Sequence, residues 1–289
     1  MDAANRTAAL QLRGYGVCFG TRVILGAVDL VLPATGIDVL MGPVKTGKST
    51  LLRSVAGLNQ GNALFREWGE RVAPAGVALV QQHAAILQAT VGDAVVHRLR
   101  QDGARRGVAW SDLAQQALGE HGLDALPVGQ ALIDLPLQQQ RAIGILARAL
   151  TGPGLLMIDE PTYGLDESQA HWMIDWLRAL GRSTRLLVVL HHQGQARRLA
   201  DRVVLLGGGR VLAHAATEDF FIRPPNAWVQ QFVRSGSLAI ASPDAPPEDL
   251  GPDAEPPPPL PPQALEAVAA FRAAHAAAPS PTPAPAPAP

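Results

Sequence analysis

The feature that most restricts the fold is a glycine-bearing stretch between an apolar run and a helical pattern. Residues Gly42 to Ser49 match the spacing G-x-x-x-x-G-K-[ST]. The run Val39–Met41 before it predicts a buried strand, and Lys48–Ala56 predicts a helix. A loop that joins a strand to a helix in this way wraps its backbone N–H groups around a phosphate. A chance match is the alternative, and the strand and helix on either side argue against it.

Lysine is almost absent from the chain. Arginine supplies 22 of the 24 basic residues, and the two lysines, Lys45 and Lys48, both lie in the glycine-bearing stretch. Lys48 is expected to reach the β- and γ-phosphates of a nucleotide in a cradle that the larger guanidinium does not fit. Lys45 contacts phosphate or a facing subunit, or is a solvated loop side chain. The predicted nucleotide site is the whole loop: Gly42, Pro43, Val44, Lys45, Thr46, Gly47, Lys48, Ser49 and Thr50.

A second apolar run ends in two carboxylates. Leu155–Ile158 predicts a buried strand, and Asp159 and Glu160 follow it directly. A carboxylate at this place can hold Mg²⁺, often through water, together with the hydroxyl of Ser49. Glu160 is then placed to act as a general base toward an attacking water. A solvated pair of acids at a strand end is the simpler alternative, which the phosphate loop makes improbable.

Composition excludes several classes of protein. The net charge of −1 argues against a chain that coats nucleic acid, so no nucleic-acid partner is expected. A single cysteine, Cys18, excludes a disulfide framework and a cysteine-based metal site. No apolar run approaches the roughly 20 residues that span a bilayer, and the N-terminus shows no signal peptide. The chain is expected to be soluble and cytoplasmic.

Composition divides the chain near residue 236. Before it, apolar runs such as Leu186–Leu190 are typical of parallel strands covered on both faces, and residues 91–150 read as mostly helical. After it, residues 243–289 contain 16 of the 25 prolines and one base against six acids. Residues 236–289 are therefore expected to be a Pro/Ala-rich acidic tail without a fixed fold, apart from a short helix over Gln263–Ala278. A segment that docks a partner is the alternative.

With these motifs in this order, the chain resembles the nucleotide-binding subunit of an ABC transporter over about residues 10–235. Asp159 begins D-E-P-T-Y-G-L-D, which is similar to the Walker B and D-loop segment of that family. Phe19, which lies 23 residues before Gly42, matches the aromatic that stacks on adenine; a core aromatic is the alternative.

Two further loops carry the resemblance. Gln82 looks like the Q-loop glutamine, which contacts Mg²⁺ and water beside the groove for the membrane partner, and Gln81 is the rival for this role. His191 follows an apolar run and looks like the switch histidine that contacts the γ-phosphate. A histidine buried in the core is the alternative. The resemblance thus implies Glu160, His191 and Gln82 as catalytic residues, and Ser49, Gln82 and Asp159 as metal ligands.

The resemblance implies an α/β fold, a P-loop NTPase (RecA-like) core over residues 8–235 with an N-terminal antiparallel β part and an inserted helical subdomain at about 91–150. It implies ATP and Mg²⁺ as cofactors. The partners would be a second ATP-binding subunit, in a homodimer or heterodimer, and a membrane permease, with the chain peripheral on the inner face of the cell membrane. Import is favoured over export. A likeness in Thr217–Gly236 to importers of phosphate and polar amino acids implies one of these as the cargo. A soluble ATP-dependent regulatory or assembly switch is the alternative.

One motif of the family is degenerate. Where the family has L-S-G-G-Q, Ile133–Arg141 reads I-D-L-P-L-Q-Q-Q-R, and two alignments place Leu135–Leu137 or Leu137–Gln139 over the serine and glycines. Proline has no N–H donor, and a Cβ atom keeps the backbone farther from a phosphate than glycine does. ATP binding is therefore expected, whereas a homodimer is expected to hydrolyse ATP slowly.

Overall fold

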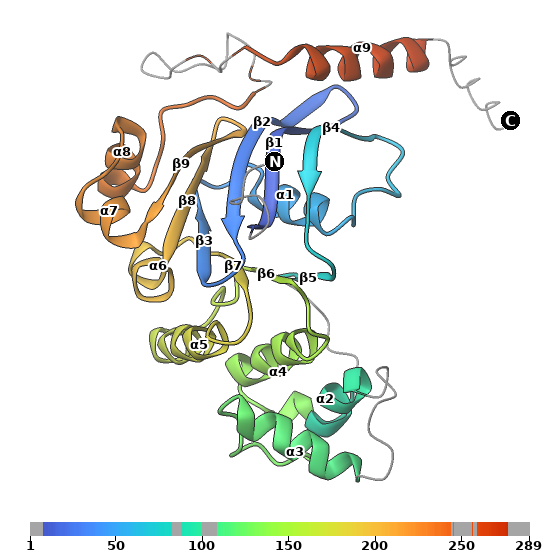
Figure 1. Cartoon of the computed structure of the whole chain (residues 1–289), viewed down its shortest axis with the longest axis vertical. Coiled ribbons are helices and arrows are strands. Elements are labelled where there is room, and N and C mark those ends of the chain that lie inside the picture. The colour runs from blue at the N-terminus through green and yellow to red at the C-terminus, as the bar shows by residue number, and fades with distance from the viewer. Residues whose placement is uncertain are drawn as a thin grey trace, which may run out of the picture.

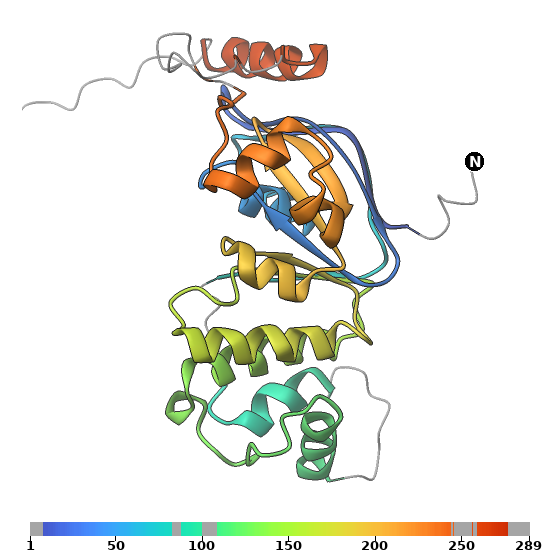
Figure 2. The ribbon, with the colours of Figure 1, turned by 90° about the vertical axis from the view of Figure 1, so that its left-hand side faces the viewer.

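The computed structural model describes residues 8–82, 88–99, 109–243, 245, 256 and 259–276. Two sheets carry the fold, and a helical subdomain and helix α9 lie at opposite ends of the molecule (Figure 1). Figure 2 shows the same arrangement after a quarter turn. The strands are β1 Ala8–Phe19, β2 Arg22–Pro33, β3 Ile37–Met41, β4 Phe65–Val72, β5 Val77–Val80, β6 Leu155–Asp159, β7 Leu186–Val189, β8 Arg202–Gly207 and β9 Arg210–Ala216.

The helices lie between and after these strands. They are α1 Lys48–Val55, α2 Val91–Leu99, α3 Trp110–Glu120, the 3-10 helix η3 Leu132–Asp134, α4 Leu137–Ala149, α5 Glu167–Leu180, α6 Gln193–Leu199, α7 Thr217–Ile222, α8 Ala227–Ser235 and α9 Pro262–Ala276. Within the described ranges, no helix has the length and apolar character needed to cross a membrane.

The six-stranded sheet has the order β5-β6-β7-β3-β8-β9, and only β9 runs antiparallel to its neighbour. All residues of β3, β6 and β7 are buried, as expected for parallel strands with both faces covered. The carboxyl ends of β3, β5, β6 and β7 therefore meet at one edge. This edge brings together the segments that begin at Gly42, Gln81, Glu160 and Leu190.

The second sheet is the expected antiparallel part, with the order β2-β1-β4. One face of it packs on α1 through residues such as Leu12, Val17 and Leu25, which share a buried cluster with Leu51 and Leu52. The two sheets thus have the arrangement expected of an α/β fold with an N-terminal antiparallel part.

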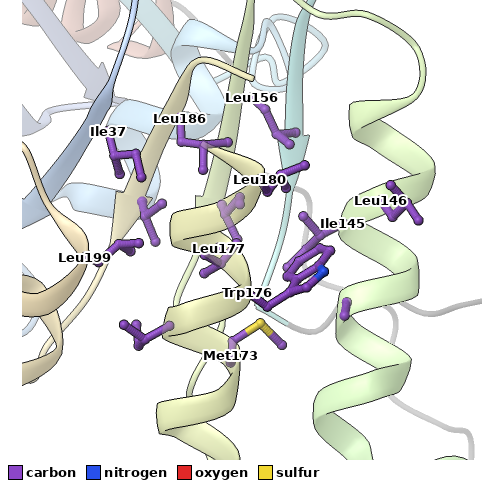
Figure 3. Packing of buried hydrophobic residues seen from close by; sticks show 14 of the residues in the cluster. Ile37, Ile145, Leu146, Leu156, Met173, Trp176, Leu177, Leu180, Leu186 and Leu199 are labelled. Carbon is purple, nitrogen blue, oxygen red and sulfur yellow. The ribbon is translucent and has the colours of Figure 1, made fainter. Parts of the chain in front are cut away.

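The main core lies on the other face of the parallel sheet. Figure 3 shows Met173, Trp176 and Leu177 of α5 between the sheet and helix α4. Helix α5 begins at a capping box, in which the Asp166 carboxylate accepts from the N–H of Gln169. The same cluster continues into α2 and α3, so the helical subdomain is packed on the core through α4.

The helix expected in the C-terminal tail is present among the described residues, and it docks on the fold, which was not expected. Residues Pro262–Ala276 form helix α9, close to the helix expected over Gln263–Ala278, and α9 packs on the outer face of the antiparallel sheet. The physical reason is that Ala264 finds an apolar site there, with 0% of its surface exposed. Leu265, the next residue along α9, is 56% exposed.

A charged cluster is buried at the opposite edge of the parallel sheet from the loops. Asp38 of β3 is fully buried and accepts hydrogen bonds from the guanidinium of Arg185 and from Nε2 of His214, the latter at 2.6 Å. Burial alone would raise the pKa of the Asp38 carboxyl, but His214 and Arg185 outweigh burial and hold that pKa below its usual value. The stabilisation is therefore present at neutral pH and is lost as the pH falls through the lowered pKa.

Asp38→Asn is expected to lower the free energy of unfolding by about 3 kcal/mol, because it leaves the charge of Arg185 buried without its counterion. Asp175→Asn is the matched control, since Asp175 pairs with Arg198 where both side chains are about half exposed, and it should cost under about 1 kcal/mol. Urea unfolding at pH 7 measures both values. Equal losses in the two variants would contradict the role given to the Asp38 cluster.

Candidate functional site

The loop between β3 and α1 follows the path that its glycines allow. Gly42 has a φ of 149°, and a Cβ atom there would lie 2.1 Å from the carbonyl oxygen of Leu206, so no side chain fits. Gly47 caps α1 in the left-handed region with a φ of 94°. The Thr46 hydroxyl closes the loop by donating to the carbonyl of Pro43 at 2.9 Å. The turn therefore directs the amino end of α1 into the loop, as a phosphate site requires.

Lys48 lies inside the loop and not on its surface. Its Nζ donates to the carbonyl oxygens of Gly42 at 2.9 Å and Pro43 at 2.7 Å, and 5% of the residue is exposed. Burial lowers the pKa of Lys48 to about 8, while the nearby carboxylates of Glu160 and Asp159 act in the opposite direction. The ammonium group is thus held by the loop carbonyl oxygens and lies near two carboxylates, inside the loop that is expected to bind phosphate.

Lys45 and Val44 occupy the outer part of the loop. Val44 is 73% exposed, and Lys45 is exposed with a φ of 67°, a left-handed conformation that costs a residue with a Cβ atom about 1–2 kcal/mol. The exposure agrees with the alternative of a solvated Lys45 side chain and leaves it available to a facing subunit. A strained backbone conformation that is retained in such a loop indicates that function, and not folding alone, constrains the loop.

Asp159 and Ser49 meet at the end of β6. The Asp159 carboxyl is buried; burial raises its pKa, and a hydrogen bond from the Ser49 hydroxyl opposes this rise. Its Oδ1 atom is buried with no hydrogen-bond partner. A buried carboxylate oxygen without a donor is costly unless a cation or water joins it. The pair therefore fits Mg²⁺, which prefers oxygen ligands and keeps several waters.

Glu160 joins the two loop residues expected beside it. Its Oε1 lies 2.5 Å from Nε2 of His191, and its Oε2 accepts from Nε2 of Gln82 at 3.0 Å. Glu160 itself has a φ of 49°, a left-handed conformation that is uncommon for a residue with a Cβ atom. The rival residue Gln81 is exposed, so the geometry favours Gln82. The three residues named as catalytic thus form one cluster, drawn from the ends of three neighbouring strands.

Phe19 ends strand β1, and its ring packs on that of Phe65 with centroids 5.6 Å apart. It is partly buried, so the structure leaves both the stacking role and the core role open. Ile24 of the same hairpin contacts the loop, since its Cγ2 lies 2.9 Å from the position of a Cβ at Gly47. Ile24 could not be predicted from the sequence, because one apolar residue in a strand carries no signal of this contact.

The degenerate segment adopts a defined structure. Pro136 is the N-cap residue of α4 and provides no side-chain cap, and Ile133 just before it is 85% exposed. Arg141 of α4 donates to the carbonyl oxygens of Pro161 at 2.9 Å and Tyr163 at 2.5 Å. Arg141 therefore holds the segment after Glu160 against α4, a role that the Q-Q-Q-R run by itself does not indicate.

Comparisons with known proteins identify the family. A model described as ABC transporter matches residues 25–163. The chain is 36% identical over 245 residues to the Fe(3+) ions import ATP-binding protein FbpC of Streptomyces coelicolor, which covers 81% of this chain and 69% of the relative. The corresponding FbpC of Streptomyces avermitilis is 35% identical over 234 residues, which covers 78% of this chain and 67% of the relative. The chain belongs to the ABC transporter ATP-binding family.

Other relatives of this ATP-binding protein agree with that assignment. The sulfate/thiosulfate import ATP-binding protein CysA of Mycobacterium tuberculosis is 34% identical over 236 residues, covering 78% of this chain and 66% of the relative. Among solved structures, a transporter described as of the metal-chelate ABC type, in an inward-facing conformation, matches with a TM-score of 0.60 at 21% identity. The match covers 74% of this chain and 85% of that chain and supports the fold.

The affinity for ATP is expected to fall as the pH rises above about 8, because Lys48 then loses the proton that a phosphate contact needs. The loss should approach tenfold per pH unit, since one proton must be taken up on binding. Calorimetry at pH 7 and pH 9, in two buffers of different ionisation enthalpy, measures both the affinity and the proton uptake. Constant affinity and no proton uptake at pH 9 would contradict the position given to Lys48.

Proposed function

We propose that this chain is the ATP-binding and ATP-hydrolysing subunit of an ABC importer. The observation that carries the proposal is the cluster of Glu160, Gln82 and His191 beside the buried ammonium of Lys48. A phosphate loop alone would support nucleotide binding. A carboxylate held at the same edge, with its two oxygens bonded to side chains from neighbouring strands, adds a base for hydrolysis.

In the proposed reaction, each residue acts at a stated atom. Lys48 directs its Nζ to the β- and γ-phosphates, and the loop N–H groups cradle them. A carboxylate oxygen of Glu160 accepts the proton of the attacking water. The oxygen of that water bonds to the γ-phosphorus while the bond from this phosphorus to the β–γ bridging oxygen breaks and ADP leaves. Gln82 orients that water, and His191 Nε2 contacts the γ-phosphate once the nucleotide is bound. Phe19 stacks on the base.

Asp159, Ser49 and Gln82 are the proposed ligands of Mg²⁺. The unpartnered Oδ1 of Asp159 and the adjacent hydroxyl of Ser49 supply the hard oxygen atoms that this ion prefers. When bound there, Mg²⁺ would neutralise charge on the phosphate oxygens.

The partners follow from the same proposal. A permease receives the conformational change through the Gln82 region, with the chain held on the inner face of the membrane by that partner. A second ATP-binding subunit faces the loop, where Val44 and Lys45 are exposed. The named cargoes of the relatives are iron(III), sulfate or thiosulfate, and spermidine or putrescine. The finer expectation of phosphate or a polar amino acid rests only on the likeness in Thr217–Gly236, and the cargoes of these relatives do not include either.

Lys48→Ala is expected to weaken ATP binding by at least 100-fold, about 3 kcal/mol, because it removes the only cation inside the described loop cradle. Arg182→Ala, which removes one positive charge from an exposed position, is the control and should leave the affinity unchanged. Fluorescent-ATP titration measures both. Tight binding retained by Lys48→Ala would refute the phosphate site.

The purified chain alone is expected to hydrolyse ATP slowly. In both alignments of the degenerate segment, residues other than serine and glycine, Leu137 among them, stand where the backbone of the family approaches the phosphate closely and donates hydrogen bonds to it. Loss of one such donor typically lowers the rate by a factor on the order of 10²–10³. Phosphate release is measured for the wild type and for Glu160→Gln, which removes the base and sets the background. Turnover by the wild type at the rate of family members with an intact signature would contradict this prediction.

Co-purification separates transport from the alternative of a soluble ATP-dependent switch. The degenerate segment and the acidic tail favour the switch, and the import proteins among the relatives favour transport. Extraction in mild detergent is expected to recover the chain with a membrane protein. Recovery only in soluble complexes would decide for the switch.

A further inference from the structure

The first described part of the tail lies against bare backbone of the β8–β9 turn. A Cβ atom at Gly208 would lie 2.7 Å from Ile240 Cδ1, and one at Gly209 would lie 2.2 Å from Pro243 Cγ. Both glycines have positive φ, at 54° and 68°. The turn therefore accepts the tail only because it has no side chains here.

The same part of the tail forms a wall of a pocket beside the phosphate loop. Ile24 of the hairpin, Lys45 and Thr46 of the loop, and Ile240 and Pro243 of the tail all line this pocket. The tail thus lines the same pocket as Lys45 and Thr46 of the proposed nucleotide site and as Ile24, which contacts the loop.

The second described part is α9, which covers the outside of that hairpin. Ala264, Ala267, Val268 and Phe271 have the spacing of one helix face. Ala264 is fully buried, Ala267 and Val268 pack around it, and the Phe271 ring lies 3.3 Å from the position of a Cβ at Gly20. Helix α9 therefore docks next to Phe19, on the turn that joins β1 to β2.

The residues beneath α9 connect it to the pocket. Cys18, Val23 and Trp68 form one buried cluster with Ala264, and Val23 also lines the pocket. Trp68 donates from Nε1 to the carbonyl of Gly26 at 3.1 Å, which ties the same cluster to β2. A further bond, from Arg210 to the carbonyl of Pro259 at 2.9 Å, fixes the start of α9 to the β8–β9 turn.

We propose that the two tail segments, Leu238–Pro243 and Pro259–Ala276, form a strap that holds the β1–β2 hairpin in its nucleotide-binding position. Docking of α9 and binding of ATP then strengthen each other, because coupling between two sites is reciprocal. The inference rests on the proposed function, since it concerns the same nucleotide site. The role of the Pro/Ala-rich tail in this proposal is to stabilise the hairpin beside the bound nucleotide.

The first test is a pair of full-length variants. Ala264→Glu places a charge in a fully buried position and undocks α9. Ala270→Glu places the same charge on the exposed side of the same helix and is the matched control. Ala264→Glu is expected to weaken ATP binding at least about fivefold, the lower end of typical coupling between sites, whereas Ala270→Glu leaves it unchanged. Thermal unfolding of both variants checks that the domain remains folded.

The second test uses the only cysteine of the chain. Cys18 has no exposed surface and lies under α9, so its reaction with N-ethylmaleimide reports on undocking. Saturating ATP is expected to slow this reaction at least about fivefold in the wild type, by the same reciprocity, and to have no effect in Lys48→Ala. Ala264→Glu is expected to react faster than the wild type in either condition.

The outcomes separate this inference from the proposed function. ATP binding with the same affinity in Ala264→Glu, together with Cys18 labelling that ATP does not change, overturns the strap and leaves the proposed function standing. Tighter binding by Ala264→Glu also overturns the strap, because it would show that the tail obstructs the nucleotide. A wild-type chain that does not bind ATP overturns the proposed function and the strap together.

Discussion

The close approach of Gly42 to Leu206 is the constraint on which the site depends. With 2.1 Å between the Leu206 carbonyl oxygen and the place of a Cβ, the chain leaves β3 along a path that only glycine follows. This path turns the loop back over β8 and brings Lys48 under the carbonyls of Gly42 and Pro43. A side chain at residue 42 would displace the loop from the edge where Asp159 and Glu160 end their strand. The binding of phosphate and the placement of the acids therefore both depend on glycine at residue 42.

The pattern of apolar residues and the motif spacing were enough to predict the strands and the helix around this loop. The run Val39–Met41 lies in β3, the helix expected over Lys48–Ala56 is α1, and Leu155–Ile158 lies in β6. Each has a strong signal, because strands buried on both faces are continuous apolar runs and the loop has a fixed spacing. Gln82 and His191 are expected from the family resemblance, and the parallel order of β5, β6 and β7 in the structure places both beside Glu160.

Contacts between distant segments could not be predicted in this way. Asp38 and Arg185 are 147 residues apart, and neither belongs to a motif. In α9, alanine is so frequent that the sequence does not show which face is apolar, and the docked face is selected by the sheet below it. Ala264 is buried against Cys18, Val23 and Trp68, whereas Leu265, on another side of the helix, is exposed.

The hydrogen bonds within the site bear on the order in which it is filled. Lys48 is bonded to loop carbonyls, and Glu160 is bonded to Gln82 and His191, so a nucleotide or an attacking water must replace bonds that already exist. Oδ1 of Asp159 is different, since it is buried without a donor, and a cation gains there without displacing a partner. Burial also raises the pKa of this carboxyl, so the charge of a cation relieves an unfavourable state of the protein. A nucleotide that enters with its cation would therefore gain an interaction at Asp159 that a nucleotide entering alone would lack.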